Sequence, residues 1–303
     1  MTDRLSRALR CLDGLSVGDA FGQQFFSPRQ IVTPQRIERD EIPDPPWFHT
    51  DDTEMAICLL QVLSRHGRVD QDDLAITFAR RYMNDPERGY GGGAKKLLVE
   101  IYSGTHWRQA ARNLFDGGSM GNGSAMRIAP LGAYFADDTP LLIEQAHLSA
   151  QVTHFHAEGS AGAIAIALAA AFAANHCGDK TPALIREFFE FVIELTPPGQ
   201  TRDGIAAAMD LPRSSAIEDA VALLGNGSQI TCPDTVPLCL WLAARHWGDY
   251  RHAMWMTVTA AGDIDTNCAV VGGIVALTSD VPIPANWLSA RGPVRLDSAN
   301  PDR

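Results

Sequence analysis

Residues 162–174 read GAIAIALAAAFAA, the most apolar stretch of the chain. Alanine has the highest helix propensity, and this run is shorter than the roughly 20 apolar residues that a membrane-spanning helix needs. Small side chains also allow neighbouring helices to approach closely. We therefore expect a buried helix over about 158–174, at the centre of the molecule.

The apolar residues before and after this run also repeat with helical spacing. Met55, Leu59 and Val62 form one stripe, followed by Gly67 as a helix stop, and a similar stripe begins at Leu5. Strand-like alternation is scarce. The pattern predicts an all-α protein, with further helices over residues 70–82, 94–102, 105–114, 140–151, 182–194, 215–224, 235–246, 249–260 and 265–278.

Length and composition set the broad class of the protein. A chain of 303 residues, 46% of them hydrophobic, can bury a large core, and no strong linker divides it. We expect one compact helical domain over 1–303, with a poorly ordered tail from about 285 to 303. The N-terminal segment carries charges throughout, so neither a signal peptide nor a membrane span is expected.

Charge and cysteine usage exclude other classes. The 25 basic and 36 acidic residues give a net charge of −11, and the basic residues are scattered, which disfavours nucleic acid as a partner. The six cysteines include no CxxC pair. This usage favours reduced thiols, a cytoplasmic location and no structural zinc.

Two clusters of aspartate and threonine stand far apart in the chain, each at the start of a predicted helix. Residues 48–55 read FHTDDTEM, with Thr50, Asp51 and Asp52, and residues 261–268 read AGDIDTNC. The second cluster comprises Asp263, Asp265 and Thr266. Adjacent carboxylates repel each other, so each cluster needs a compensating partner.

Helix capping and metal binding are the two explanations that remain open for these clusters. Asp51 with Glu54 resembles a capping box, and acids favour the positive end of a helix. Capping accounts for one acid per helix but not for two acids and a hydroxyl at both sites. Carboxylate and hydroxyl oxygens are ligands for Mg²⁺ or Mn²⁺, and two facing clusters could hold two such ions.

Six motifs, in order and over nearly the whole chain, resemble the ADP-ribosylglycohydrolase family, the relatives of the dinitrogenase reductase activating glycohydrolase. They read GLSVGDAFG, HTDDTEM, RGYGGGAKKLL, GNGSAMRIAPLG, SAQVTHFHAEG and AGDIDTNCAVVGGIVAL. The resemblance implies an all-helical fold with two Mg²⁺ or Mn²⁺ ions at one end. It also implies hydrolysis of the glycosidic bond between ADP-ribose and an acceptor, with ADP-ribose or an ADP-ribosylated acceptor as partner.

Residue roles follow from the same resemblance, position by position. It makes Thr50, both residues of the Asp51–Asp52 pair, Asp263, Asp265 and Thr266 the metal ligands, and it makes Asp51, Asp52 and Asp265 the catalytic candidates. The six proposed ligands are the same residues whose hard oxygen atoms suggested metal binding, and the three catalytic candidates are among them.

Substrate contacts are expected from three other motifs. Gly89, Gly91 and Gly92 free backbone N–H groups for a diphosphate, and Tyr90 offers a ring for adenine. Asn122, Gly123 and Ser124 lie at a helix start, where the amide and hydroxyl suit ribose or phosphate oxygens and equally suit an N-cap. Matched positions in the family suggest ribose contacts for His154 and His156, although we expect at least one of them to be a core histidine with satisfied hydrogen bonds.

The sequence departs from the family in two places. Many members carry a catalytic Glu after the first motif, whereas this chain offers Gln23, Gln24 and Phe26. Amides cannot act as a general base near neutral pH, so the proton of an attacking water would pass to Asp51 or Asp52. The second departure is Ile264, where Thr is common between the two acids.

The missing Glu keeps two further functions open. One is a catalytically impaired ADP-ribose-binding regulatory protein. The other is a di-metal hydrolase that acts on a small ADP-ribose-like metabolite. Release of ADP-ribose from modified acceptors distinguishes the first from a hydrolase, and a panel of free nucleotide sugars distinguishes the second.

Overall fold

The computed structural model describes residues 4–296, and in this part of the chain all regular secondary structure is helical. The all-α prediction is confirmed. The α-helices are α1 Arg4–Gln23, α2 Pro34–Glu38, α3 Asp51–His66, α4 Gln71–Asn84, α5 Gly92–Tyr102, α6 Trp107–Asn113, α7 Ala129–Tyr134, α8 Thr139–Gln151, α9 Ala157–Asn175, α10 Pro182–Leu195, α11 Gln200–Asp210, α12 Ile217–Leu224, α13 Cys232–Arg245, α14 Tyr250–Thr259, α15 Ile264–Val275 and α16 Ala285–Ala290. Two short 3-10 helices are η1 Gln24–Phe26 and η2 Asn122–Ser124.

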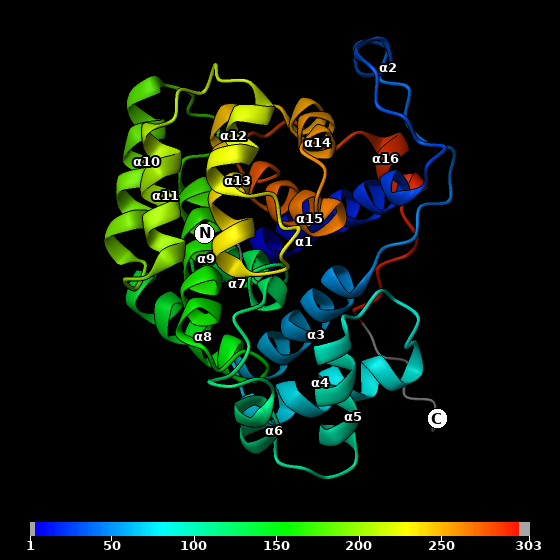
Figure 1. Ribbon diagram of the computed structural model, residues 1–303, viewed down its shortest axis with the longest axis vertical. Coiled ribbons are helices and arrows are strands. Elements are labelled where there is room, and N and C mark those ends of the chain that lie inside the picture. Colours follow the sequence, from blue (N-terminus) through cyan, green and yellow to red (C-terminus); the bar gives the residue numbers. More distant parts are fainter. Residues whose placement is uncertain (1–3, 297–303) are drawn as a thin grey trace.

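The Ala-rich helix α9 lies beside α10 and α11 in the left part of Figure 1, and its residues from Glu158 to Ala173 are all buried. Helices α7, α8, α10, α13 and α15 pack against it. At 19 residues α9 is longer than the apolar run that predicted it, and its length and composition alone would allow a membrane span. However, 89% of its apolar window is buried inside the protein, so α9 is a core helix.

Helices α1 and α15 pack in direct backbone contact. A Cβ placed on Gly18 of α1 would lie 2.1 Å from the carbonyl oxygen of Cys268, and one on Gly22 would lie 2.7 Å from that of Ile264. Glycine at these positions lets the two backbones approach more closely than any side chain would permit. The contact fixes the end of α1 beside the start of α15.

Helices α3 to α6 form a second group, seen in the lower part of Figure 1. In this group α3 packs on α4, α4 on α5, and α5 on α6, while α3 also contacts α1 and α15. The N-terminus of α3 therefore meets the paired helices α1 and α15. The buried apolar side chains of both groups belong to one connected cluster; a single domain over 1–303 stays a prediction.

Four helices were not predicted from the sequence: α2, α7, α11 and α16. Helices α2, α7 and α16 have five or six residues, too few for a repeating apolar stripe. The start of the predicted tail is in fact α16, where the ring of Trp287 is fully buried against Phe21 and Trp47. Residues 297–303 of that tail lie outside the described part of the chain.

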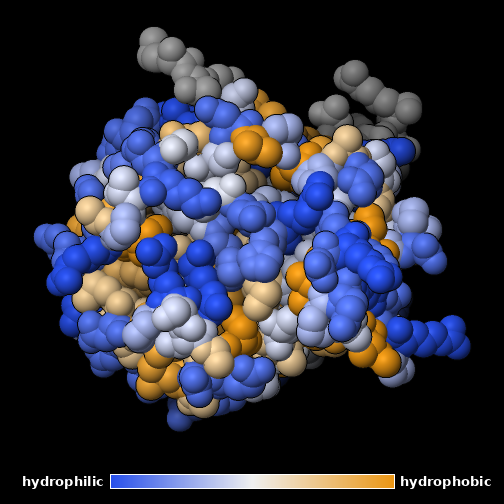
Figure 2. All heavy atoms as spheres, turned by 90° about the horizontal axis from the view of Figure 1, so that it is seen from above, coloured by the Kyte–Doolittle hydropathy of each residue, from blue (hydrophilic) through white to orange (hydrophobic). Residues whose placement is uncertain are grey.

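Hydrophilic and hydrophobic residues are interspersed on the face shown in Figure 2. The long loop and short helix between α1 and α3 project from the body of the molecule (Figure 1). Trp47 anchors the end of this excursion, because its N–H donates to the carbonyl of Ala290 at 2.7 Å and its carbonyl accepts from Gly292 at 2.9 Å. These two hydrogen bonds fix the position of the chain just before α3 begins.

Candidate metal centre

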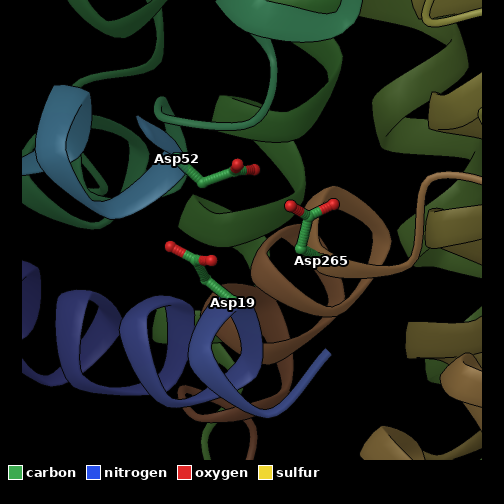
Figure 3. Close-up of side chains that lie close together, drawn as sticks. All are labelled: Asp19, Asp52 and Asp265. Atoms are coloured by element: carbon green, nitrogen blue, oxygen red, sulfur yellow. The ribbon is translucent and has the colours of Figure 1, made fainter. Parts of the chain in front are cut away.

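Three aspartates from distant parts of the chain converge where α1, α3 and α15 meet. Asp19 comes from α1, Asp52 from the first turn of α3 and Asp265 from the first turn of α15. Their side chains point toward one another (Figure 3), and one carboxylate oxygen of each lies within 4.8 Å of the others. The structure therefore brings together the two clusters that the sequence singled out, and adds Asp19.

Asp19 holds the first turn of α3 in place. Its carboxylate is fully buried and accepts hydrogen bonds from the backbone N–H groups of Thr50, at 2.9 and 3.0 Å, and Thr53, at 3.1 Å. Both threonine hydroxyls also lie within hydrogen-bond distance of it. Asp19 thus caps α3 from another helix, a role that a residue of α3 itself would ordinarily fill.

The carboxylates of this centre resist ionisation. Burial, followed by the charge of Asp19, raises the pKa of Asp51 to about 7 and that of Asp52 well above its ordinary value. Burial and the charge of Asp263 raise the pKa of Asp265 in the same direction. Among the described residues, none of these carboxylates pairs with Lys or Arg within ion-pair distance. When these carboxylates are ionised, no protein cation in contact compensates their charge.

One oxygen of the centre has no partner. Asp52 is 1% exposed, and its Oδ1 is buried without a hydrogen bond, whereas Oδ2 lies 3.0 Å from the hydroxyl of Thr50. A buried carboxylate oxygen without a partner is costly. Converging carboxylate and hydroxyl oxygens are the donor set of Mg²⁺, Mn²⁺ or Ca²⁺, so the residues present fit a hard divalent cation.

The remaining predicted ligands border these three aspartates. Asp51 is the first residue of α3, and its Oδ1 lies 3.4 Å from a Cβ placed on Gly89. Asp263 is the N-cap residue of α15 but makes no capping bond; its Oδ2 accepts a hydrogen bond from the amide of Asn122 at 2.7 Å. Thr266 is buried in the first turn of α15.

The capping-box interpretation of Asp51 and Glu54 was wrong. Thr50 is the N-cap residue of α3 and makes no side-chain cap, while Glu54 turns to other partners. Glu54 lies 2.8 Å from Nε2 of His49 and also pairs with Arg81 of α4. Burial alone would raise the pKa of Glu54, but hydrogen bonds from His49 and Arg81 outweigh it and lower the pKa to about 2. Glu54 is therefore an ionised support for the loop that precedes α3.

The glycine-rich segment RGYGGG lies directly over this loop. Gly89 adjoins Thr50 and Asp51, and Arg88 donates a hydrogen bond to the carbonyl of His49 at 3.1 Å. Gly91 is the N-cap residue of α5, and Gly92 is its first residue. The ring of Tyr90 is not an open surface: it is 3% exposed and packs edge-on against Tyr82, with centroids 5.0 Å apart.

An exposed aromatic ring does stand beside this segment. Phe115 is 62% exposed, with a positive φ of 74°, and its ring atoms lie 3.2 and 3.3 Å from a Cβ placed on Gly93. Phe115 was not among the residues predicted from the sequence. Its signal was an apolar residue directly before the turn sequence DGG, where burial is not expected.

Asn122 and Ser124 have internal partners. The amide of Asn122 binds Asp263 and also donates to the hydroxyl of Thr235 at 3.0 Å. Ser124 is fully buried and donates to the carbonyl of Gly159 at 2.7 Å. Asn122 thus orients a carboxylate of the centre, and Ser124 ties η2 to α9.

The two histidines differ in environment. His156 is the N-cap residue of α9, and its Nδ1 accepts a hydrogen bond from the N–H of Glu158 at 3.1 Å. His154 lies against Gly123, 3.0 Å from a Cβ placed there. Burial, followed by the charge of Arg127, lowers the pKa of His154 to about 3, so this ring is neutral.

The structure also shows where the residues that differ from the family motifs lie. Phe26 ends η1 and is 50% exposed, and the amide of Gln24 donates to the carbonyl of Ala20 at 3.1 Å. Ile264 is buried at the start of α15. Neither Gln24 nor Phe26 has an ionisable group that could act in the centre.

Asp19 is the residue of the acidic centre that was not predicted from the sequence. A carboxylate inside the otherwise apolar or small segment GLSVGDAFG, near the end of a buried helix, was the available signal. Its proximity to Thr50 and Asp265 depends on how α1, α3 and α15 pack, which no local pattern encodes.

Comparison with known proteins identifies the family of the chain. The family model described as ADP-ribosylglycohydrolase matches residues 1–299. The chain is 30% identical to ADP-ribosylhydrolase ARH3 of Homo sapiens, over 93% of this chain and 88% of that protein. It is 26% identical to the ADP-ribosyl-[dinitrogen reductase] glycohydrolase of Rhodospirillum rubrum, over 93% and 89%.

A solved structure has the same fold. The ADP-ribosylglycohydrolase-related protein complex aligns with a TM-score of 0.67 and 25% identity, over 96% of this chain and 94% of that one. The family match spans almost the whole sequence and includes all three helices that build the acidic centre. The chain therefore belongs to the ADP-ribosylglycohydrolase family.

Proposed function

We propose that this protein is a metal-dependent hydrolase that cleaves the glycosidic bond between ADP-ribose and an acceptor, and so reverses ADP-ribosylation. The observation that carries the proposal is the buried convergence of Asp19, Asp52 and Asp265, with one oxygen of Asp52 unpartnered. Such a centre is stable in its ionised form only when a cation compensates it. Family membership supports the class of bond.

The proposed ligands are the hydroxyls of Thr50 and Thr266 and the carboxylates of Asp51, Asp52, Asp263 and Asp265, with two Mg²⁺ or Mn²⁺ as the ions. When bound, such ions would act as Lewis acids that orient sugar hydroxyls and make water more acidic. Asp19 lies among these carboxylates, but its oxygens are occupied by Thr50 and Thr53. Its first role is to hold the ligand loop.

The chemistry that the protein side chains would supply is acid–base and electrostatic. Asp51 and Asp52 are the first two residues of α3, and either carboxylate, ionised when cations are bound, could take the proton of an attacking water. Positive charge develops on the sugar as the glycosidic bond breaks, and the surrounding carboxylates stabilise it.

Parts of ADP-ribose far from the reacting bond need their own contacts. The backbone N–H groups at the start of α5, with Gly91 and Gly92, suit a diphosphate. Because Tyr90 is buried, we assign the adenine contact to the exposed ring of Phe115 beside Gly93. Contacts of this kind hold the sugar in place for attack.

The direct test is release of ADP-ribose from arginine-, serine- and nucleobase-linked substrates with added Mg²⁺ or Mn²⁺. Asp265→Ala should lose metal affinity and turnover together, while Asp210→Ala, at the exposed end of α11, should behave as wild type. Full activity of Asp265→Ala in EDTA would contradict the metal-dependent mechanism.

A second candidate function is favoured by one observation. Phe26, exposed beside the end of α1, cannot serve as a base, which suits an ADP-ribose-binding regulatory protein that has lost turnover. Tight binding of ADP-ribose with no release from any linked substrate would support this alternative. Hydrolysis confined to free nucleotide sugars would instead support a hydrolase of a small ADP-ribose-like metabolite.

A further inference from the structure

Arg127 is a fully buried cation, and it has no anionic partner among the described residues. Its side chain is 0% exposed, and it forms no ion pair with any carboxylate in residues 4–296. Instead its guanidinium donates to the carbonyls of Gly123, at 2.8 Å, and Ser149, at 3.0 Å, and lies 4.8 Å above the ring of Phe78. A charge buried in this way is costly, which raises the question of what it does.

The same guanidinium reaches a candidate substrate residue through one hydroxyl. Nη2 of Arg127 donates to Oγ1 of Thr153 at 2.8 Å, and Oγ1 lies 2.7 Å from Nδ1 of His154. Thr153 is 4% exposed, so its hydroxyl has little access to water. The three side chains form a chain of two short hydrogen bonds.

The proton positions in this chain follow from donor and acceptor chemistry. Arginine can only donate, so Oγ1 of Thr153 accepts from it. The hydroxyl proton of Thr153 then has one acceptor within reach, Nδ1 of His154, and any other arrangement leaves a buried proton without a partner. Since the ring of His154 is neutral, its own proton must lie on Nε2.

We propose that Arg127 and Thr153 are positioning residues that fix His154 in the Nε2–H tautomer, so that it presents one hydrogen-bond donor to an acceptor oxygen of the substrate. Arg127 acts through Thr153, and Thr153 acts through His154. The buried charge also opposes protonation of the ring, whose pKa is lowered to about 3 by burial and by Arg127.

The place of Nε2 supports a ligand contact. A Cβ on either Gly121 or Gly123 would lie 3.2 Å from Nε2 of His154. Glycine at both positions keeps side-chain atoms away from this donor, and His154 is half-buried, not fully buried. The loop that carries these glycines also carries Asn122, which binds Asp263 of the acidic centre. The donor therefore faces the same loop that supports a proposed metal ligand.

The identity of the ligand in this inference rests on the proposed function. The first test needs no ligand and is therefore independent of that function. Nitrogen-15 NMR of the histidine rings in the unliganded full-length chain reports the tautomer directly. Wild type and Thr153→Ser should show His154 with the proton on Nε2, whereas Thr153→Val, which has the same shape but no hydroxyl, should show a mixture of tautomers. A wild-type proton on Nδ1, or an unchanged tautomer in Thr153→Val, would overturn the proposal.

Calorimetry with ADP-ribose and Mg²⁺ supplies the second test. Thr153→Val should weaken binding about fivefold, the scale of one hydrogen bond, and Thr153→Ser should restore it. In a His154→Leu background Thr153→Val should have no further effect, because Thr153 acts through the ring. An equal further loss in that background would overturn the proposed order of action.

The two tests separate the inference from the proposed function. If wild type does not bind ADP-ribose but shows the expected tautomer, the proposed substrate is wrong and the arrangement of the three side chains stands. If wild type binds ADP-ribose but the tautomer is Nδ1–H, the function stands and the positioning role is wrong.

Discussion

Asp19 in α1 accepts a hydrogen bond from the backbone N–H of Thr53 in α3 at 3.1 Å. With the bond from Thr50, this contact makes a carboxylate of one helix the cap of another. The loop that carries Thr50 and Asp52 is therefore fixed by α1, and α1 is fixed on α15 by backbone contact. The geometry of the acidic centre depends on this chain of contacts.

Asp19→Ala should lower the free energy of unfolding in EDTA by roughly 2–4 kcal/mol, because it removes a helix cap and leaves buried N–H groups unpaired. Asp19→Asn keeps one acceptor oxygen and removes a repelling charge, so its loss should be smaller. Urea unfolding measures both. Equal stability of Asp19→Ala and wild type would refute the capping role.

Glu54 gives a second stability prediction. Its side chain is 8% exposed and pairs with Arg81 and His49, so Glu54→Gln at pH 7 should cost roughly 3 kcal/mol, the scale of breaking a buried ion pair. Glu190→Gln on α10, whose partner Arg186 is exposed, should change stability by less than about 1 kcal/mol.

The pH dependence of the same variant follows from the pKa of Glu54. The folded pKa of about 2 lies below the ordinary value of 4.5, so this group stabilises the fold above pH 4.5. That contribution is lost as the pH falls from 4.5 toward about 2. Unfolding curves of Glu54→Gln should therefore lose part of the acid dependence that wild type shows; parallel curves would contradict the assignment.

The acidic centre should give the opposite pH dependence in EDTA. The pKa of Asp51 is raised from 3.8 to about 7 in the folded chain, so its contribution to stability is complete below pH 3.8 and is lost as the pH rises through about 7. Asp51→Asn should flatten this loss. Because cations bind the ionised carboxylates, added Mg²⁺ should raise the melting temperature more at pH 8 than at pH 5. A melting temperature unaffected by millimolar Mg²⁺ at pH 8 would count against a metal centre.

The fold was accessible from the sequence because helical spacing of apolar residues is a local signal. Met55, Leu59 and Val62 are all buried in α3, although every residue from Asp52 to Leu63 is buried as well, so this helix is enclosed on all sides and not along one stripe. The acidic clusters were also found, since carboxylates next to hydroxyls at helix starts are visible in the sequence. What joins Asp52 to Asp265 is tertiary packing, and only the resemblance to a family could anticipate it.

Residues whose role depends on packing could not be predicted in the same way. Asp19 was hidden in an apolar motif, and Glu54 was assigned to a capping box because its spacing fits one. In the structure Glu54 forms a buried ion pair with Arg81 and does not cap α3. Tyr90 shows the reverse error: an aromatic ring in a glycine-rich segment suggested a ligand surface, but Tyr82 covers it.

The adenine contact can be tested by comparing two rings. Phe115→Leu should weaken ADP-ribose binding by roughly 1–3 kcal/mol, the scale of base stacking, with little effect on stability because the ring is 62% exposed. Phe115→Tyr should bind as wild type. Tyr90→Ala should instead destabilise the fold, because its ring is buried against Tyr82. Unchanged affinity of Phe115→Leu by calorimetry would remove this residue from the site.

The general base that accepts the proton of the attacking water is not supplied by the residues at the end of α1 or just after it. Gln23 and Gln24 are amides, and Phe26 has no ionisable group, so the proton of the attacking water must pass to a carboxylate of the centre. Asp51 and Asp52 stand in the first turn of α3, and we test Asp52 first because its side chain points toward Asp265 across the centre. Gln23→Ala should therefore retain turnover, and Asp52→Asn should lose most of it.

Asp52→Asn keeps the shape of the side chain but removes its charge, so two effects must be separated. Metal binding, followed by the Mn²⁺-dependent shift in melting temperature, and ADP-ribose binding, followed by calorimetry, report whether the site is still assembled. If both persist while turnover collapses, the loss is chemical, and Asp52 takes the proton. If turnover persists at the wild-type rate with the ions bound, Asp51 is the remaining carboxylate of the same turn, and Asp51→Asn should then abolish the reaction.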